Sequence, residues 1–179
     1  MIRGILRVRS SLLIAAASSI LLLAVAWAQL GEGTKSPDFR LQSLDGKMLT
    51  LAQIRKDPAR PGANRVVILD FWATWCDPCK EELPIFQKLH QKYGKKGLVV
   101  VGLSVDRGGI RDVKPFVKQR KLTYTMLVDP KGTVKSAYRV RFLPTTFIID
   151  KKGFIRAVHI GYTPEVGAQL EHDIKPLLK

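Results

Sequence analysis

The sequence predicts an α/β fold in which helices cover both faces of a central β-sheet. Three segments, VVILDFW (66–72), LVVVGLSV (98–105) and TTFIID (145–150), are almost continuously apolar and rich in β-branched residues. Such runs are typical of strands that are buried on both faces rather than half exposed. A helical pattern separates the first two runs, so the alternation of strand and helix predicts a three-layer sandwich without determining the strand order.

The segment before these strands predicts a β-hairpin and a short helix. Polar and apolar residues alternate over residues 39–48 on either side of the turn pair Asp45-Gly46, which is a strong hairpin signal. Thr50 is placed to cap a helical turn that ends near Ile54. Residues 56–65 contain two prolines and a glycine and therefore predict an exposed loop.

Apolar periodicity predicts a helix from Asp77 to Tyr93, and Gly94 is placed to end it. Thr163-Pro164 predicts the start of the last helix, because proline is tolerated at the first helical position. The remaining predicted elements are a helix that Asp112 caps and that runs to Lys121, a strand over 125–128, a helix over 131–138, a strand over 154–160, and a final helix capped by Thr163.

The first thirty residues predict export. Arg3, Arg7 and Arg9 precede an uncharged apolar run over residues 12–28, which ends in the small–x–small triplet Ala26-Trp27-Ala28. These features match a secretory signal cleaved after Ala28, but a run of this length also approaches the roughly 20 residues of a membrane-spanning helix. We therefore predict a signal peptide or a retained N-terminal membrane anchor over residues 1–30, a linker over 31–37 and a folded α/β domain over 38–179.

Either leader places the domain outside the cytoplasm, in the bacterial periplasm or on the outer face of the cytoplasmic membrane, because positive charge before an apolar run stays on the cytoplasmic side. The chain has a net charge of +15, and removing the three leader arginines leaves +12. Such a surface suits anionic lipid headgroups or acidic partners, or serves only solubility. Export argues against a nucleic-acid partner.

The chemistry centres on Cys76 and Cys79, which are the only cysteines in the sequence. Cys76 follows a buried strand and opens a helix, where unpaired backbone N–H groups and the helix dipole stabilise a thiolate. Cys79 lies one turn further on, so the pair can close a disulfide whose loop is too short to stabilise the fold much. Such a pair suits thiol–disulfide exchange, in which one thiolate attacks a foreign disulfide and the second resolves the mixed disulfide.

Several other uses of two thiols stay open from the residues alone. A zinc site needs two further ligands, and the three histidines, His90, His159 and His172, lack finger-like spacing. Soft thiolates also hold Cu(I) in metallochaperones. A thiol peroxidase needs a hydroxyl that holds peroxide, for which Thr74 is the nearby candidate, and two buried inert thiols need no chemistry at all. Thiol exchange itself requires no metal and no organic cofactor, and we expect none.

The residues around the pair resemble a known family. WCDPCK after an apolar strand is similar to thioredoxin, and residues 35–179 resemble the TlpA/ResA-type extracytoplasmic thiol–disulfide oxidoreductases through SPDF, LDG, FWATWC and PTTFIID. The resemblance implies a thioredoxin-like three-layer sandwich, with a mixed central sheet flanked by helices, an added N-terminal hairpin and a central insertion. It also implies a reductant of client-protein disulfides, in many members for apocytochrome c maturation. Because such a reductant is oxidised in each cycle and must be reduced again, a membrane dithiol electron donor is a further expected partner.

Position by position, the resemblance makes Cys76 the exposed nucleophile and Cys79 the resolving thiol of a redox-active disulfide. Pro144 matches the family's cis-proline, which lies beside the disulfide and pairs with substrate backbone, so Leu143 and Pro144 are predicted to bind substrate. Trp75, next to the first thiol, is a third substrate-binding candidate. Trp72 also matches a flanking aromatic of the family, although ordinary core packing explains it equally well.

Two acids are predicted to move protons for the sulfur atoms as part of the catalytic set. Asp70 interrupts an apolar strand, where burial raises the pKa of a carboxyl, and it matches thioredoxin's buried acid. Glu82 lies one turn after Cys79 on the same helical face and matches an acid of ResA-type proteins. The alternatives are a hydrogen-bonded structural role for Asp70 and a solvated surface position for Glu82.

Two further residues bear on redox direction and substrate. Asp77 lies between the cysteines, and its negative charge opposes a thiolate at Cys76, which favours a reducing pair over the alternative of a dithiol oxidant. Phe142 stands two residues before the matched cis-proline, where the family usually has glycine. A bulky apolar side chain at this position is expected to reshape the substrate groove or to help form it.

Overall fold

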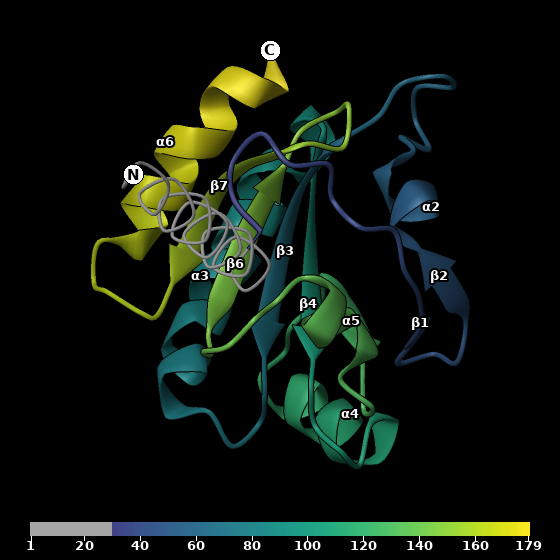
Figure 1. The fold of residues 1–179 in the computed structure, drawn as a ribbon, viewed down its shortest axis with the longest axis vertical. Helices are drawn as coiled ribbons and strands as arrows, with labels where there is room; N and C mark the ends of the chain where they lie inside the picture. Colours follow the sequence, from purple (N-terminus) through teal and green to yellow (C-terminus); the bar gives the residue numbers. More distant parts are fainter. Residues whose placement is uncertain (1–29) are drawn as a thin grey trace, which may run out of the picture.

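The computed structural model describes residues 30–179, so the predicted leader lies outside the described residues except for Leu30. Seven strands form one mixed sheet in the order β2-β1-β5-β4-β3-β6-β7 (Figure 1). No helix among residues 30–179 is long and apolar enough to cross a bilayer. The elements are β1 (Arg40–Ser43), β2 (Met48–Thr50), α2 (Leu51–Arg55), β3 (Val66–Trp72), α3 (Asp77–Tyr93), the 3-10 turn η1 (Gly94–Lys96), β4 (Leu98–Ser104), α4 (Ile110–Gln119), β5 (Thr125–Val128), α5 (Thr133–Ala137), β6 (Thr145–Ile149), β7 (Ile155–Ile160) and α6 (Val166–Leu178).

The strand that leads to the cysteines, β3, lies between β4 and β6 near the middle of the sheet. It runs parallel to β4 and antiparallel to β6, so that Asp70 is paired with Gly102 on one side and with Thr146 on the other. Every residue of β3, β4 and β6 is buried. The prediction of strands covered on both faces is therefore confirmed.

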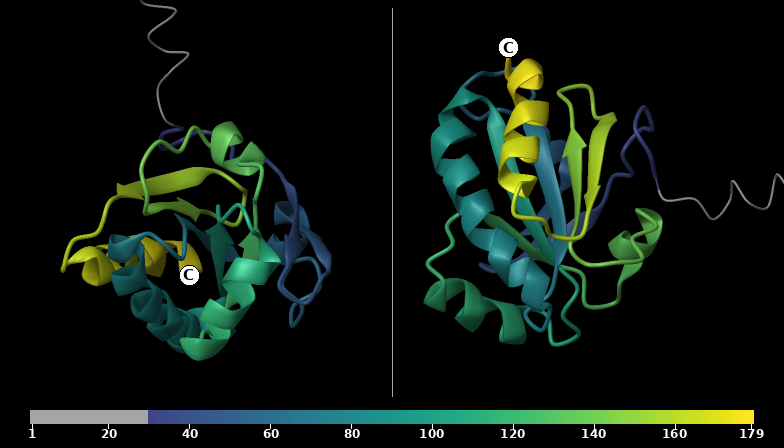
Figure 2. Two further views of the ribbon diagram at one scale, coloured as in Figure 1. Left: turned by 90° about the horizontal axis from the view of Figure 1, so that it is seen from below. Right: turned by 90° about the vertical axis from the view of Figure 1, so that its left-hand side faces the viewer.

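Alternate residues of β3 point into two separate hydrophobic cores. Val66, Ile68 and Trp72 pack under α3, α4 and α6, whereas the side chains between them face α2 and α5. Figure 2 shows these helices on opposite sides of the sheet. The layers confirm the predicted three-layer α/β sandwich, and they place Asp70 on the α3 side because it alternates in phase with Ile68 and Trp72.

The N-terminal hairpin forms as predicted and extends the sheet. β1 and β2 pair antiparallel around the turn at Asp45-Gly46, and β1 also pairs antiparallel with β5. Gly46 has a positive φ of 86°, which glycine adopts without steric cost. Thr50 caps α2 in a reciprocal capping box with Gln53, which satisfies backbone N–H groups at the helix start.

The segment predicted as a linker, residues 31–37, lies against the β6–β7 turn. The Gly33 N–H donates to the Ile155 carbonyl at 2.8 Å, and the Ser36 N–H donates to the Gly153 carbonyl at 3.0 Å. Ser36 is buried. Backbone hydrogen bonds therefore hold this segment along the domain before β1 begins.

Two predicted helix starts are wrong. Helix α4 begins at Ile110 with Gly109 as its N-cap, so Asp112 lies in the first turn rather than before it. The positive φ of Gly109, 58°, lets the chain turn into the helix earlier than an Asp cap would require. Helix α6 begins at Val166 with Glu165 as its N-cap, because Thr163 and Pro164 form a preceding turn in which the Thr163 carbonyl accepts the Val166 N–H.

The central sheet leaves no room for a side chain at Gly102, the residue paired with Asp70. A Cβ atom there would lie 2.6 Å from the Met126 Sδ and 3.0 Å from the Trp72 Nε1. We expect Gly102→Ala to lower the free energy of unfolding by roughly 1–3 kcal/mol, the usual cost of overpacking. Urea unfolding of the oxidised protein measures this. Gly31→Ala is the control, because its Cβ would meet no atom within 4 Å, and equal stability of Gly102→Ala and wild type would contradict the packing argument.

Candidate active site

Strand β3 delivers Cys76 to the N-terminus of α3. The chain leaves β3 at Trp72, and the Cys76 N–H closes a turn by donating to the Ala73 carbonyl at 3.2 Å. Cys76 is the N-cap of α3, with Pro78 in the first turn. This position gives the sulfur the unpaired N–H groups and positive dipole end that the sequence predicted.

Cys76 and Cys79 form a disulfide across this first turn, with their Cα atoms 5.3 Å apart. The Cys76 Sγ also accepts a hydrogen bond from the Cys79 N–H at 3.3 Å. Cys76 retains 6% of its surface exposed and Cys79 only 1%. A thiolate at Cys76 would keep this N–H donor, and Cys76 is the less buried residue of the pair.

The loop between β3 and α3 is held by Asp106, a residue that the sequence reasoning missed. Asp106 is buried after the end of β4, and its carboxylate accepts hydrogen bonds from the Thr74 N–H at 3.0 Å and from the Thr74 hydroxyl at 2.6 Å. The Ser104 hydroxyl donates to the same carboxylate at 2.7 Å. The sequence feature that could have identified Asp106 is an acid just after a buried strand, where that strand runs parallel to the one that precedes the cysteines.

Asp70 and Glu82 are both buried on the α3 side of the sheet, where the charge of Glu82 acts on Asp70. Each side chain is only 1% exposed, so the prediction that Asp70 is buried is confirmed and the alternative of a solvated Glu82 is wrong. The Thr146 hydroxyl donates to the Asp70 Oδ1 at 3.4 Å. Burial and the neighbouring charge of Glu82 raise the pKa of Asp70 well above its ordinary value, and burial raises the pKa of Glu82 to about 7.

Tyr124 extends this buried polar group toward β5 and was also missed from the sequence. Burial raises its phenol pKa well above the ordinary value, and the charges of Asp70 and Glu82 add to the rise. The Asp70 Oδ2, the Glu82 Oε2, the Tyr124 hydroxyl and the Trp72 Nε1 have no hydrogen-bond partner among the described residues. Glu82, on the face of α3 that carries Cys79, can therefore exchange a proton near neutral pH, and Asp70 on β3 is a second buried carboxyl that interacts with it.

The predicted substrate-binding residues differ in their exposure. The Leu143–Pro144 peptide bond is cis, as the resemblance implies, and the Pro144 carbonyl accepts the Gly161 N–H at 2.9 Å. Leu143 is half-buried against both cores. Trp75 and Phe142 are each 66% exposed. The chain therefore presents two large apolar side chains, one beside Cys76 and one beside Leu143, whereas Trp72 is fully buried in the core.

The negative charge of Asp77, which lies between the cysteines, is partly offset by Lys80. Asp77 is exposed and pairs with Lys80 at 2.7 Å. The hydrogen bond from Lys80 lowers the pKa of Asp77, so this carboxylate remains charged, but the ammonium beside it weakens its effect on Cys76. Asp77 therefore favours a reducing pair less strongly than an unpaired carboxylate would.

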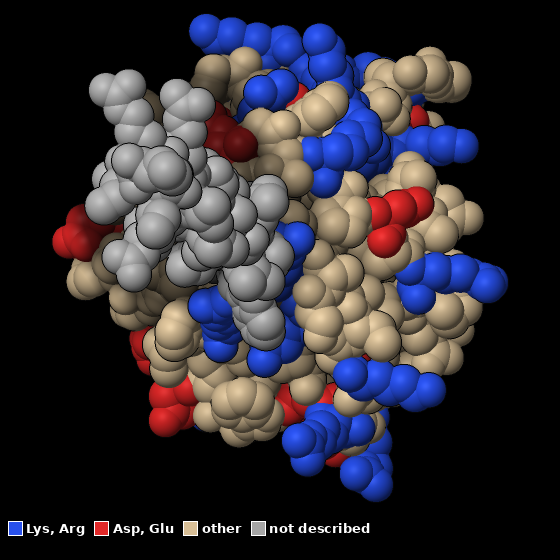
Figure 3. All heavy atoms as spheres, viewed as in Figure 1, with Lys and Arg blue, Asp and Glu red and all other residues tan. Residues whose placement is uncertain are grey.

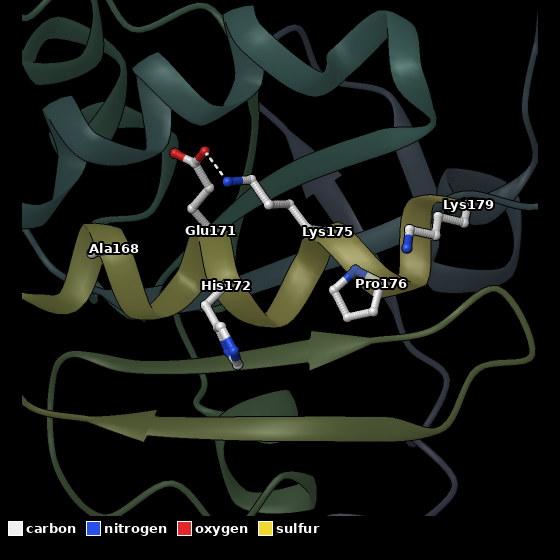
Figure 4. Close-up of a pocket in the computed structure, with 6 residues that line it drawn as sticks. All are labelled: Ala168, Glu171, His172, Lys175, Pro176 and Lys179. Atoms are coloured by element: carbon white, nitrogen blue, oxygen red, sulfur yellow. Dashed lines mark ion pairs between the residues drawn. The ribbon is translucent and has the colours of Figure 1, made fainter.

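Pockets on the described surface lie both beside Trp75 and away from the disulfide. One lies beside Trp75 and is lined also by Asp106, Arg107, Pro130 and Lys131. Another lies on α6, and Figure 4 shows Glu171 there in an ion pair with Lys175. The α6 hollow contains neither cysteine, and no group of three His, Cys, Asp or Glu side chains among residues 30–179 is arranged to hold a metal ion.

A disulfide across the first turn of a helix, at the carboxyl end of the central strand of this fold, defines a thiol–disulfide oxidoreductase of the thioredoxin superfamily. The family model described as AhpC/TSA family matches residues 33–158. The chain therefore belongs to the AhpC/TSA family.

Individual relatives agree with this assignment. The chain is 36% identical over 131 residues to the thioredoxin-like protein YneN of Bacillus subtilis (strain 168), covering 73% of this chain and 72% of the relative. It is 37% identical over 146 residues to the thiol-disulfide oxidoreductase ResA of Bacillus thuringiensis subsp. konkukian (strain 97-27), covering 81% and 78%. A solved structure described as a putative thiol:disulfide interchange protein DsbE from Chlorobium tepidum matches with a TM-score of 0.75 and 34% identity, over 84% of this chain and 99% of that one.

The raised pKa of Glu82 predicts a pH-dependent stability. The folded protein holds a proton on Glu82 that the unfolded chain releases between pH 4.5 and about 7. This group's contribution to the free energy of unfolding is therefore fully present below pH 4.5 and is lost as the pH rises to about 7. We expect Glu82→Gln to remove up to about 3 kcal/mol of the loss between acidic and mildly alkaline pH.

Urea unfolding of the oxidised protein on either side of this pH range measures the effect. The exposed neighbour provides the matched control, because Glu81→Gln should leave the wild-type pH dependence unchanged. An equal loss of stability with rising pH in wild type and Glu82→Gln would show that the Glu82 carboxyl titrates normally.

Proposed function

We propose that this protein reduces disulfides of client proteins outside the cytoplasm, with Cys76 as nucleophile and Cys79 as resolving thiol. One observation carries the proposal: the two sulfurs close a disulfide at the α3 N-terminus, where Cys76 is 6% exposed and Cys79 1%. A pair whose first cysteine is the less buried suits sequential attack and resolution. The names of the ResA and DsbE relatives, which denote thiol–disulfide chemistry, support it.

The proposed cycle moves two electrons from the dithiol to the client. The Cys76 thiolate attacks one sulfur of the client disulfide, which forms a mixed disulfide and expels the other client sulfur as a thiolate. Cys79 then loses its proton and attacks the Cys76 sulfur, so that the second client thiolate leaves and the Cys76–Cys79 disulfide forms. A carboxylate of the Asp70–Glu82 pair accepts the Cys79 proton, and burial makes that exchange accessible near neutral pH.

Client recognition is assigned to the surface around the disulfide. Trp75 directly precedes Cys76, and Phe142 lies two residues before Pro144 in the loop that the resemblance assigns to substrate backbone. Both side chains are exposed. Exposed aromatic side chains supply large contact areas for apolar client segments. Phe142, at a position where the family usually has glycine, adapts this groove to clients of the present protein.

The remaining steps of the proposal follow from the leader and the resemblance. The apolar run over residues 12–28 exports the domain to the periplasm or to the outer face of the cytoplasmic membrane, by a cleaved signal or a retained anchor. In an oxidising compartment the oxidised pair must be reduced again, which requires a membrane dithiol donor. Apocytochrome c is the client class that the TlpA/ResA resemblance favours.

A dithiol oxidant is the second candidate, and the Asp77–Lys80 ion pair is the observation that favours it, because Lys80 offsets the charge that would disfavour a Cys76 thiolate. Reduction potential separates the two functions. Equilibration with glutathione should give a value of about −200 mV or lower for a reductant, whereas about −120 mV would identify an oxidant. Lys80→Gln leaves Asp77 uncompensated and should shift the potential toward more negative values.

Loss of the nucleophile tests the proposal directly. We expect Cys76→Ser to abolish reduction of insulin disulfides by the prereduced protein, because the remaining thiol, Cys79, is only 1% exposed. Turbidity of precipitating insulin chains measures the activity. Glu81→Gln, an exposed substitution on the same helix, should retain wild-type activity. Full activity in Cys76→Ser would overturn the assigned chemistry.

Removal of the resolving thiol should instead stop the cycle halfway. In Cys79→Ser, Cys76 still attacks a client but the mixed disulfide is not resolved, so clients accumulate as covalent adducts. Non-reducing electrophoresis followed by mass spectrometry identifies them. Adducts that require Cys76 and disappear with dithiothreitol are the expected result. Equal adduct yields from the Cys76→Ser/Cys79→Ser double variant would contradict it.

A further inference from the structure

Basic side chains gather around the β6–β7 turn, at the end of the sheet farthest from the disulfide. The Lys35 ammonium donates to the Lys152 carbonyl at 2.7 Å, and the Arg55 guanidinium donates to the Lys151 carbonyl at 2.6 Å. Both groups also border Gly153, where an added Cβ would lie 2.7 Å from Arg55 and 3.3 Å from Lys35. Main-chain carbonyls, rather than carboxylates, therefore hold these two cations at the turn.

A second basic segment flanks the same end of the sheet on the α3 side. Lys95 and Lys96, both exposed, lie in η1 directly before β4. The Val66 N–H at the start of β3 donates to the Gly97 carbonyl, and the next residue of β3 is paired with Ile149 at the end of β6. The starts of β3 and β4 and the end of β6 thus share one edge. We define the basic end by six residues: Lys35, Arg55, Lys95, Lys96, Lys151 and Lys152.

Three acids near the basic end are paired with other cations, whereas Glu32, in the segment beside the β6–β7 turn, forms no ion pair with another described residue. Asp57 pairs with Arg60 at 2.7 Å, and Asp150 pairs with Arg156 at 2.7 Å. Glu171 pairs with Lys92 at 2.9 Å and with Lys175 at 3.0 Å. None of these carboxylates forms an ion pair with the six residues of the basic end. The Lys151 ammonium donates to a main-chain oxygen of Lys179 at 2.6 Å. No Asp or Glu side chain among residues 30–179 forms an ion pair with any of the six cations.

The disulfide end carries charges of both signs. Asp77, Glu81, Asp106 and Asp112 lie in or beside the starts of α3 and α4, and Lys80, Arg107 and Arg111 lie among them. Figure 3 shows Lys and Arg side chains across the top of the view, where Figure 1 places the end of α6 and the β6–β7 turn. Cys76 follows the carboxyl end of β3, at the bottom of the same view. The basic end and the disulfide therefore lie at opposite ends of the strands, and the disulfide end carries exposed lysines of its own, among them Lys114, Lys118, Lys121 and Lys131.

We propose that the basic end docks on anionic phospholipid headgroups and so directs the disulfide away from the bilayer. The basic end spans the sheet and the segments beside both of its faces, which suits a broad layer of phosphates better than a single bound anion. Clustered Lys and Arg are attracted to an anionic membrane surface within about one Debye length. This docking does not depend on which disulfides the protein reduces.

The position of the N-terminal segment argues for a lipid surface as the partner. Residues 12–28 form an uncharged apolar run, and the chain joins the domain through Gly33–Ser36, which hydrogen-bond to Ile155 and Gly153 of the β6–β7 region. A leader in the membrane would therefore bring the basic end to the headgroups. The domain without the leader is a suitable test object, because both of its cores consist of residues 30–179. In addition, the match to the Chlorobium tepidum structure covers 99% of that chain and 84% of this one.

Vesicle binding of residues 30–179 tests the proposal. We expect the domain to sediment with phosphatidylcholine vesicles that contain phosphatidylglycerol, and to bind pure phosphatidylcholine at least about tenfold more weakly. Raising the salt concentration to about 0.5 M should release it, because the Debye length shortens. The quadruple variant Lys95→Glu, Lys96→Glu, Lys151→Glu, Lys152→Glu should lose at least about tenfold in partition coefficient.

The matched control places the same charge change at the other end of the molecule. Lys114→Glu, Lys118→Glu, Lys121→Glu and Lys131→Glu alter four exposed lysines of the α4 and α5 region. We expect this variant to retain most of the binding, and both variants to keep insulin reduction as evidence of folding. Equal loss in the two variants would show an effect of net charge alone and overturn the proposal. Equal binding to vesicles with and without phosphatidylglycerol, or no binding at low salt, would also overturn it.

Discussion

The burial of β3 between two cores is the constraint on which the rest of the structure depends. β4 and β6 satisfy its backbone on both edges, and helices cover both of its faces, so that its seven residues are all buried. Its carboxyl end is therefore held rigidly, and the turn through Cys76 starts α3 at one defined place. The reactive sulfur owes its position to a strand that itself contacts no substrate.

The same burial creates the chemistry of the two carboxyls on the α3 side of the sheet. An Asp in an apolar strand has no water to stabilise its charge, and a second carboxyl, Glu82, is brought onto the same face by the turn of α3. Like charges so close cannot both ionise easily, which raises the pKa of Asp70 further. Burying two carboxyls with unpaired oxygens costs stability, and the same burial provides the protonatable groups on which the proposed cycle relies.

Much of this could be read from the sequence because it depends on local patterns. The apolar runs identified the buried strands, Asp45-Gly46 identified the hairpin, and the interruption of a strand by Asp70 identified a buried acid. What escaped was long-range: Asp106 and Tyr124 reach the site from β4 and from the start of β5, so only the strand order reveals them. The starts of α4 and α6 were missed because Gly109 and Glu165, which lack the preferred capping side chains, precede them.

The clustering of charge at the basic end likewise could not be predicted from the sequence alone. The net charge of +15 was evident, but scattered lysines in the sequence resembled an ordinary solvated surface. Folding brings Lys35, Lys95 and Lys151, from three distant segments, to one edge because that edge collects the start of β4, the end of β6 and the segment before β1. In an α/β sheet the reactive group lies at the carboxyl ends of the parallel strands, so a charged surface at their amino ends can bind a partner without obstructing the chemistry.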